Sequence, residues 1–267
     1  MCVWSAPGDE VLMVFTLAGC GFARCYVLAE EEGLVVVDCG SIGTAEDVER
    51  FVVRELGRSP EEIKCIVATH FHIDHIGGIG HLLKKSGEKT RVIFHRRVRD
   101  YLSGKKTLSS QKNWIRGLYP ATFHSIRHVR KWGHLRFESL SGIPLPGLRN
   151  LVNLPYHPEK IQYHSDLTTT RHPLGCGQWD VLATPGHTED SISLYCESSA
   201  ELVCGDLVLN FKKNGSGSLN RFCCNEETLS KTYQDLCRSM EPQHIYPGHG
   251  EIISGTGNVL LKVRTFH

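Results

Sequence analysis

Several features that would assign a class of protein at once are missing from this sequence. It has no run of about 18 uninterrupted apolar residues, so no transmembrane helix and no membrane partner are expected. Its first residues carry Asp9 and Glu10 without a basic cluster, which is not typical of a signal peptide. The net formal charge is only +1, which argues against general nucleic-acid binding.

Two further absences concern reactive side chains. The eleven cysteines are an odd number and include no C-x-x-C pair, so a disulfide framework is not expected. Reduced thiols in a cytoplasmic protein are the prediction that follows. The G-x-S-x-G elbow of serine hydrolases is also absent, and a serine or cysteine nucleophile therefore receives little weight.

The sequence does contain a regular alternation of apolar and amphipathic segments. With 267 residues, 40% of them hydrophobic, residues 1–267 are expected to form one large α/β domain. Helices are predicted at 44–56, 79–87 and 226–240. Thr44 and Asp47 resemble a capping box at the start of the first of them. Strands are predicted at 11–17, 25–29, 34–38, 64–70, 91–95, 179–187, 191–197, 201–206 and 244–249. This pattern indicates a layered α/β architecture.

The segment "VATHFHIDHIGGIG", residues 67–80, concentrates metal-binding side chains. Alternate residues of an extended segment point the same way, so His70 and His72 are expected to converge on one side. Asp74 and His75 follow directly, and Gly77 and Gly78 leave room for close approach. Imidazole nitrogens and carboxylate oxygens suit zinc, iron or manganese, so the segment predicts a metal site.

Other ligands are expected where further strands end. His187 follows "ATPG", Asp206 ends "VCGD" and His249 ends "YPGH". Each combines an apolar strand, a small residue and a ligand-type side chain. Any one of them could serve a turn, but together with residues 70–75 they predict one shared site.

These motifs resemble the metallo-β-lactamase-fold superfamily. Its H-x-H-x-D-H signature and its later motifs are matched in order by His70, His72, Asp74, His75, His187, Asp206 and His249, and the aspartate of its first motif is matched by Asp38 in "VVVDCG". The resemblance covers about residues 11–95 and 178–250. It implies an αββα sandwich with two divalent metal ions at one edge of two facing sheets.

The resemblance also implies a role for each side chain. One metal would be held by His70, His72 and His187, the second by Asp74, His75 and His249, and Asp206 would bridge them. Asp38 would orient a ligand histidine. Zinc is the expected metal, with iron and manganese as alternatives.

Two such ions about 3.5–4 Å apart share a water and lower its pKa, so the expected activity is hydrolysis of an ester, thioester, lactone or phosphodiester bond. Asp74 is the candidate for catalytic proton transfer. Two alternatives stay open, an iron-dependent redox enzyme of the same fold and a member whose metal site is not catalytic.

Several branches of the superfamily fit less well. Its β-lactamases carry Cys or Ser where this chain has Asp206. Its lactonases place a tyrosine where this chain has Leu209. Glyoxalase II carries a glutathione-binding extension, whereas only 18 residues follow His249.

A basic insertion is expected at about 96–172, as an elaborated helical lid. It holds 14 Lys and Arg against 4 Asp and Glu, so the remaining chain sums to −9. Its aromatic and apolar side chains either cover the metal cleft or pack the lid onto the body of the domain; they are Trp114, Leu118, Phe123, Ile126 and Trp132. The positive charge is either a solvated face that keeps the protein soluble or, through Arg127, Arg130 and Lys131, attracts an anionic small-molecule substrate. The oligomeric state cannot be inferred from the sequence.

Overall fold

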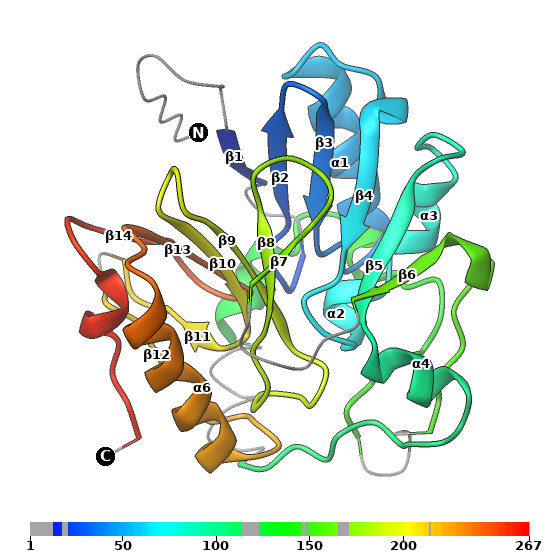
Figure 1. Ribbon diagram of the computed structural model, residues 1–267. Helices are drawn as coiled ribbons and strands as arrows, with labels where there is room; N and C mark the ends of the chain where they lie inside the picture. The colour runs from blue at the N-terminus through cyan, green and yellow to red at the C-terminus, as the bar shows by residue number, and fades with distance from the viewer. Residues whose placement is uncertain are drawn as a thin grey trace.

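The computed structural model describes residues 13–17, 21–113, 123–145, 148, 150–164, 171–213 and 215–266. Two sheets of six strands each lie face to face, with helices on their outer sides (Figure 1). The predicted αββα sandwich is confirmed. None of the helices in these ranges is long and apolar enough to cross a membrane.

The first sheet has the strand order β1-β2-β3-β4-β5-β6. β1 pairs with β2 and β2 with β3 in antiparallel orientation, whereas the pairs from β3 to β6 are all parallel. Their bounds are β1 Met13–Thr16, β2 Tyr26–Glu30, β3 Gly33–Val37, β4 Ile63–Val67, β5 Arg91–His95 and β6 Ile161–His164. The last strand, β6, was not predicted from the sequence.

The second sheet has the order β14-β13-β10-β9-β8-β7, in which only β10 and β13 are parallel. Its strands are β7 His172–Pro173, β8 Asp180–Ala183, β9 Ile192–Cys196, β10 Glu201–Gly205, β13 His244–Pro247 and β14 Ile253–Ser254. A separate ribbon joins β11 Val208–Leu209 to β12 Ser218–Leu219.

The strands of both sheets bury side chains on both faces, which explains their nearly continuous apolar sequences. In β3, Val35 and Val37 join a cluster between the sheets, whereas Leu34 and Val36 pack on the outer side. Leu194 of the second sheet belongs to the same central cluster. This alternation at every second residue fixes the two sheets as the inner layers.

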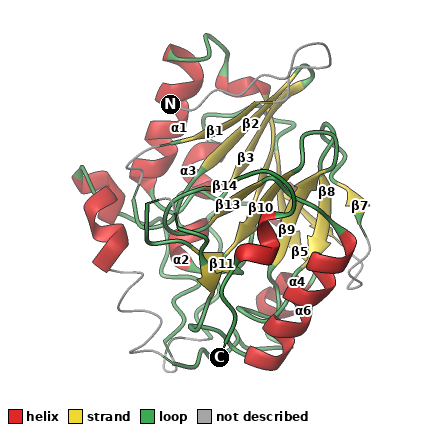
Figure 2. Ribbon diagram, turned by 90° about the vertical axis from the view of Figure 1, so that its left-hand side faces the viewer, coloured by secondary structure: helices red, strands yellow, loops and turns green. Residues whose placement is uncertain are grey.

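The outer layers are helical. Val48 of α1 and Leu82 of α3 pack on the outer face of the first sheet, and Leu229 and Leu236 of α6 on that of the second. Figure 2 shows α1 and α6 on opposite sides of the sheets. The helices are α1 Ile42–Arg54, α2 Ile73–Ile76, α3 Ile79–Leu83, α4 Arg97–Leu102 and α6 Glu226–Ser239, with short 3₁₀ turns at Pro60–Glu62, Ile126–His128, Trp132–Leu135, Pro158–Lys160 and Val259–Lys262.

The predicted start of α1 was wrong by two residues. Ser41 is the N-cap, because its hydroxyl accepts a hydrogen bond from the Thr44 amide at 3.0 Å. Thr44 therefore lies inside the first turn. Asp47 does not complete a capping box but accepts a hydrogen bond from Lys131 at 2.8 Å and contacts His134 at 2.7 Å.

In its described residues, the basic segment 96–172 forms α4, a helical turn at 123–125, three 3₁₀ turns, strand β6 and the first residue of β7. Trp114 and Leu118 lie outside the described residues. Phe123, Ile126 and Trp132 are 59%, 56% and 76% exposed, so they do not cover a cleft as predicted.

Candidate metal centre

Loops at one edge of the two sheets bring the predicted ligands together. His70 and His72 follow β4, and Asp74 and His75 lie on the short helix α2. The other three, His187, Asp206 and His249, follow β8, β10 and β13 of the second sheet. All seven side chains thus lie where the carboxyl ends of these strands meet, although they are spread over 180 positions of the chain.

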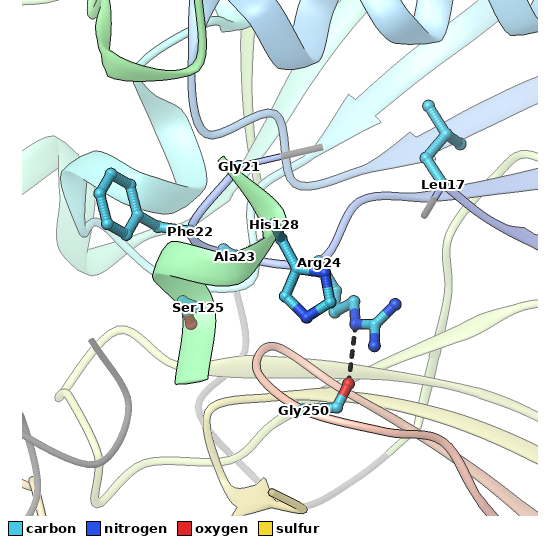
Figure 3. A pocket seen from close by; sticks show the side chains of 8 residues that line it. All are labelled: Leu17, Gly21, Phe22, Ala23, Arg24, Ser125, His128 and Gly250. Atoms are coloured by element: carbon cyan, nitrogen blue, oxygen red, sulfur yellow. Dashed lines mark hydrogen bonds between the residues drawn. The ribbon is translucent and has the colours of Figure 1, made fainter. Parts of the chain in front are cut away.

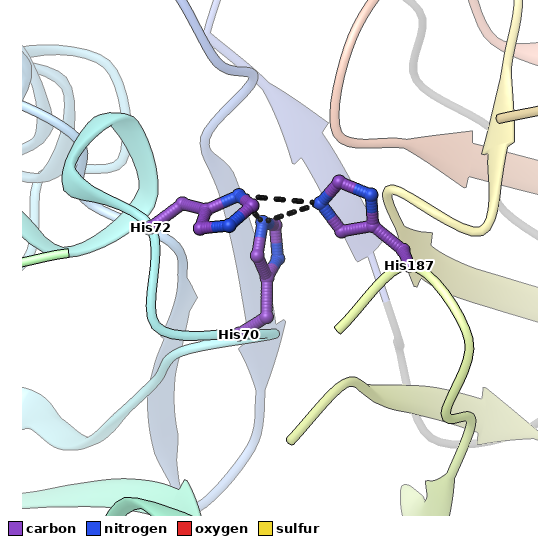
Figure 4. A group of neighbouring side chains, drawn as sticks. All are labelled: His70, His72 and His187. Atoms are coloured by element: carbon purple, nitrogen blue, oxygen red, sulfur yellow. Dashed lines mark hydrogen bonds between the residues drawn. The ribbon is translucent and has the colours of Figure 1, made fainter. Parts of the chain in front are cut away.

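Three histidine nitrogens point to one place (Figure 4). His187 Nε2 lies 3.2 Å from His70 Nε2 and 3.2 Å from His72 Nδ1, and the latter two are 3.0 Å apart. Nitrogens bound at about 2.0–2.1 Å to a tetrahedral zinc ion lie roughly 3.3 Å from one another. The triangle therefore has the dimensions of one face of a zinc coordination sphere.

A second group lies beside the first. Asp74 Oδ2 is 3.3 Å from His249 Nε2 and 4.0 Å from His75 Nε2. Asp206 lies between the groups, with one carboxylate oxygen 3.5 Å from both His187 Nε2 and His249 Nε2 and the other 3.6 Å from His75 Nε2. A carboxylate in this position can bridge two ions.

Asp38 holds two histidines of the site, His75 and His70, through a short chain of hydrogen bonds. His75 Nδ1 donates to Asp38 Oδ2 at 2.8 Å, and the Thr69 hydroxyl donates to the same oxygen at 2.8 Å. The Thr69 hydroxyl oxygen in turn lies 3.1 Å from His70 Nδ1. Asp38 has a φ of 59°, a backbone conformation that only a few residue types adopt and that clusters at functional sites.

Backbone carbonyls orient two other histidines. His187 Nδ1 donates to the Phe222 carbonyl at 2.6 Å, and His249 Nδ1 donates to the Phe22 carbonyl at 2.9 Å. Each bond fixes the tautomer, so the Nε2 lone pair faces the interior of the site. The ligand-type nitrogens are therefore oriented before any ion binds.

Burial keeps the three histidines of the first ligand group, His70, His72 and His187, neutral. It lowers the pKa of His72 to about 3 and that of His187 to about 3, and it lowers the pKa of His70 well below its usual range. Neighbouring imidazoles lower the His70 value further. All three rings therefore offer a lone pair near pH 7.

The second group behaves differently because it contains carboxylates. Burial opposes the charged form of His75, but Asp38 and Asp74 raise its pKa to about 10. Burial likewise opposes the charged form of His249, but the carboxylates of Asp206 and Asp74 together raise its pKa. Burial would raise the pKa of Asp74, but His75 and His249 lower it strongly, so this carboxyl group stays ionised.

Glycines allow this dense packing. A Cβ on Gly248 would overlap the Asp206 carboxylate and contact His75, so only glycine fits beside these two side chains. A Cβ on Gly78 would overlap the Ser41 carbonyl instead. Gly78 thus serves the packing of α3 on the loop after Asp38, rather than the direct approach to the metal site that was predicted.

The residues present fit two divalent ions. His75 Nε2 and Asp206 Oδ1 are buried and have no hydrogen-bond partner in the described part of the chain. Leaving such atoms unsatisfied is costly, and an ion between the two groups would satisfy both. The donor set of five imidazoles and two carboxylates in two groups, with His72 contributing Nδ1, suits zinc or another first-row metal.

A cleft of about 320 Å³ opens over this cluster. This volume lies at the small end of the range for small-molecule sites, about 300–1,000 Å³. Its floor is formed by His72, Asp74, Asp206 and His249, and its walls are mainly apolar, with Phe22, Ile73, Phe137, Ile143, Pro144, Leu145 and Phe222. Among its described lining residues there is no Lys or Arg.

The sequence analysis missed several supporting residues. Asp190 is buried and accepts hydrogen bonds from the Phe71 amide at 2.7 Å and from the Tyr101 hydroxyl at 3.3 Å, which pins the loop between His70 and His72. Ser125 lies 3.1 Å from His249 Nδ1, although 124 positions separate them. In the sequence, the position of Asp190 three residues after His187 was the one feature that could have indicated its supporting role.

Comparison with known proteins agrees with this geometry. The sequence model described as "Metallo-beta-lactamase superfamily" matches residues 18–249. The chain is similar to a Bacillus subtilis (strain 168) protein named "Probable metallo-hydrolase YflN", with 26% identity over 242 residues that cover 85% of this chain and 79% of that protein.

Two solved structures show the same fold at low identity. ST1585 from Sulfolobus tokodaii, described as an archaeal metallo-beta-lactamase superfamily protein, has a TM-score of 0.56 at 18% identity, covering 90% of this chain and 81% of that chain. The chemotaxis sensor ODP, described with a peroxy diiron species, has a TM-score of 0.57 at 15% identity, covering 97% and 92%. By the match of its sequence over residues 18–249, this chain belongs to the metallo-β-lactamase superfamily.

Proposed function

We propose that this protein is a dinuclear, metal-dependent hydrolase that cleaves an ester, thioester or lactone bond of a small molecule. The observation that carries the proposal is the pair of ligand groups that share Asp206 at the floor of an apolar cleft. The name of the Bacillus relative, a probable metallo-hydrolase, supports the same class of reaction.

In this proposal His70, His72 and His187 hold one ion, Asp74, His75 and His249 hold the other, and Asp206 lies between them. Zinc ions bound there would supply a Lewis acid and a water of lowered pKa. Asp74 keeps 27% of its side chain exposed and lines the cleft, so its position makes it the proposed group for proton transfer. The apolar walls limit the access of bulk water.

The cleft also supports a class of substrate. Its apolar walls suit an acyl or aromatic group next to the scissile bond, and they favour a carboxylic ester, thioester or lactone over a phosphodiester. The basic segment 96–172 contributes apolar residues such as Phe137 to these walls, but its lysines and arginines are not among the lining residues. From outside the walls, Arg127 and Arg130 would attract an anionic group elsewhere on the same substrate. The substrate would thus be apolar at one end and anionic at the other.

The nine cysteines in the described ranges are all free thiols, and we place the hydrolase in the cytoplasm on that ground. Zinc is the proposed metal. Stoichiometric iron together with consumption of dioxygen would instead support the redox alternative and contradict the proposal.

The proposal is tested with matched chromogenic substrates: 4-nitrophenyl acetate, butyrate and hexanoate, a thioester, a lactone and bis-4-nitrophenyl phosphate. We expect metal-dependent turnover of the carboxylic substrates, with kcat/KM rising from acetate to hexanoate. Phe137→Ala should reduce this rise several-fold by removing a cleft wall, whereas Phe123→Ala, at an exposed site, should not. Turnover of the phosphodiester alone would contradict the proposed substrate class.

A further inference from the structure

Two histidines and a glutamate meet outside the dinuclear cluster. His124 and His128 lie four residues apart in the short helical segment 123–128, so they project from the same side of it. Glu251 lies in the loop that follows β13. One ligand-type atom of each residue lies within 4.8 Å of the other two.

One imidazole nitrogen of His124 lacks a hydrogen-bond partner among the described residues. Its side chain is 9% exposed and packs against the Phe211 ring, with ring centroids 5.1 Å apart. Its Nε2 is buried and has no hydrogen-bond partner among the residues that the structure describes. Buried nitrogens are nearly always partnered, so this one requires an explanation such as a bound ion.

Glu251 is held in position from several sides. Its amide donates to the Asn210 carbonyl at 2.6 Å, and the Asn210 side-chain amide donates to the Glu251 carbonyl at 3.1 Å. Arg24 donates to Glu251 Oε1 at 3.1 Å. It also donates to the Gly250 carbonyl at 2.7 Å, as Figure 3 shows. No residue that the structure describes donates a hydrogen bond to the second carboxylate oxygen, Oε2, which leaves this oxygen for a further ligand bond.

The charges nearby restrict which ion would bind. Burial lowers the pKa of both histidines. Arg127 lowers the pKa of His124 further, and Arg24 lowers that of His128, so both rings keep a lone pair. The same two arginines oppose a cation, and Glu251 offsets only one positive charge. Calcium and magnesium prefer sites rich in oxygen, whereas zinc and nickel bind imidazole strongly enough to suit two histidines and one carboxylate.

A small cavity adjoins His128 and would complete the coordination. It has a volume of about 10 Å³ and is lined by Arg24, Ser125, His128 and Gly250, among others (Figure 3). This is roughly the space of one water molecule. Three protein ligands and one water make the usual coordination number of zinc.

We propose that His124, His128 and Glu251 bind a third transition-metal ion, such as zinc or nickel, in addition to the two ions of the dinuclear site. The ion would fasten segment 123–128 to the loop that carries His249. Ser125 of this segment lies 3.1 Å from His249 Nδ1 and lines the cleft, so the third ion would hold one cleft wall in place. The proposal does not rest on hydrolase activity.

The number of bound ions tests the proposal. The full chain is saturated with zinc, freed of excess zinc by gel filtration and measured by elemental analysis. His128→Ala and Glu251→Gln should each bind one equivalent less than the unaltered protein. His157→Ala, which removes an exposed histidine of the same basic segment, should bind as much as the unaltered protein.

Equal zinc content in His128→Ala and the unaltered protein would overturn the proposal. Loss of zinc in His128→Ala but not in Glu251→Gln would also overturn it, because Glu251 would then be no ligand. To separate ligand loss from misfolding, nickel is titrated into protein whose dinuclear site already holds zinc, and calorimetry measures the added binding. One nickel equivalent that is absent in both variants is expected, and no binding to the unaltered protein would contradict the site.

Discussion

Asp38 Oδ2 accepts a hydrogen bond from His75 Nδ1 at 2.8 Å, and both side chains are almost completely buried. Asp38 makes no contact with the proposed ions in this arrangement but decides which nitrogen of His75 faces them. We therefore regard it as a positioning residue. The pair ties the first sheet, through the loop after β3, to the ligands on α2.

Replacing Asp38 by Asn should weaken metal binding without unfolding the chain. The amide keeps the size of the side chain but loses the charge that polarises His75, and such changes lower metal affinity about 10–100-fold. Competition with a chromogenic chelator measures this affinity. Asp180→Asn, a partly exposed control at the start of β8, should leave it unchanged, and an equal affinity of both variants would refute the role of Asp38.

Asp206→Ala removes the carboxylate shared by the two ligand groups. We expect the variant to hold one divalent ion less and to lose turnover by orders of magnitude, because neither group retains its bridging oxygen. Far-UV circular dichroism should stay that of the folded protein. Full metal content together with full turnover would show that Asp206 does not bridge two ions.

Metal binding should release protons mainly from the second group. In the metal-free protein the His75 pKa is raised to about 10, so this ring carries an extra proton at pH 7 that must leave before a metal binds, and the pKa of His249 is raised in the same direction. Affinity at this group should therefore increase as pH rises from 6 toward 9. Calorimetry in buffers of different ionisation enthalpy counts the protons, and we expect about one per chain from His75.

The three-histidine group supplies the comparison for that experiment. His72 and His187, with pKa values of about 3, are already neutral above pH 5 and should release no protons. The first ion should thus bind with little dependence on pH between 6 and 9. A first and a second ion with the same pH dependence would contradict the difference between the groups.

The charge of the basic segment should affect substrate capture. Lys131 is engaged by Glu46 at 2.9 Å and by Asp47 at 2.8 Å, so we expect Arg127 and Arg130 to provide most of the attraction. A double Arg127→Ala, Arg130→Ala variant should lose the preference for carboxylate-bearing over neutral esters, in kcat/KM, at low salt. Raising ionic strength should abolish the preference in the unaltered protein.

Lys105→Ala removes one exposed positive charge from the same segment and serves as control for the net charge. It should keep the preference. If charged and neutral esters are turned over equally at low salt by the unaltered protein, the basic segment does not select the substrate.

Much of the fold follows from the sequence because its strands are nearly continuous runs of Val, Ile and Leu. The runs at 34–38 and 91–95 correspond to β3 and β5 within one residue. The cap of α1 was misplaced because Ser41 and Thr44 are both good caps, and only the extended backbone of Ser41 decides between them.

The ligand-type side chains were predictable because four of them stand within six positions and the rest follow strands. The groups that orient these side chains were harder to predict from the sequence. The Phe22 and Phe222 carbonyls hold histidines through backbone atoms, which leave no trace in side-chain identity. Phe123 and Trp132 were expected over the cleft, but hydrophobicity alone does not specify which surface an irregular segment covers.

The most direct test of the account is a titration of metal-free protein with zinc while the hydrolysis of 4-nitrophenyl hexanoate is followed. Metal removal is first verified by elemental analysis. We predict negligible turnover without metal and a rise that reaches its plateau only when both ligand groups are filled; the Asp206→Ala variant should stay near zero throughout. Undiminished turnover by protein verified to be free of metal would contradict the account.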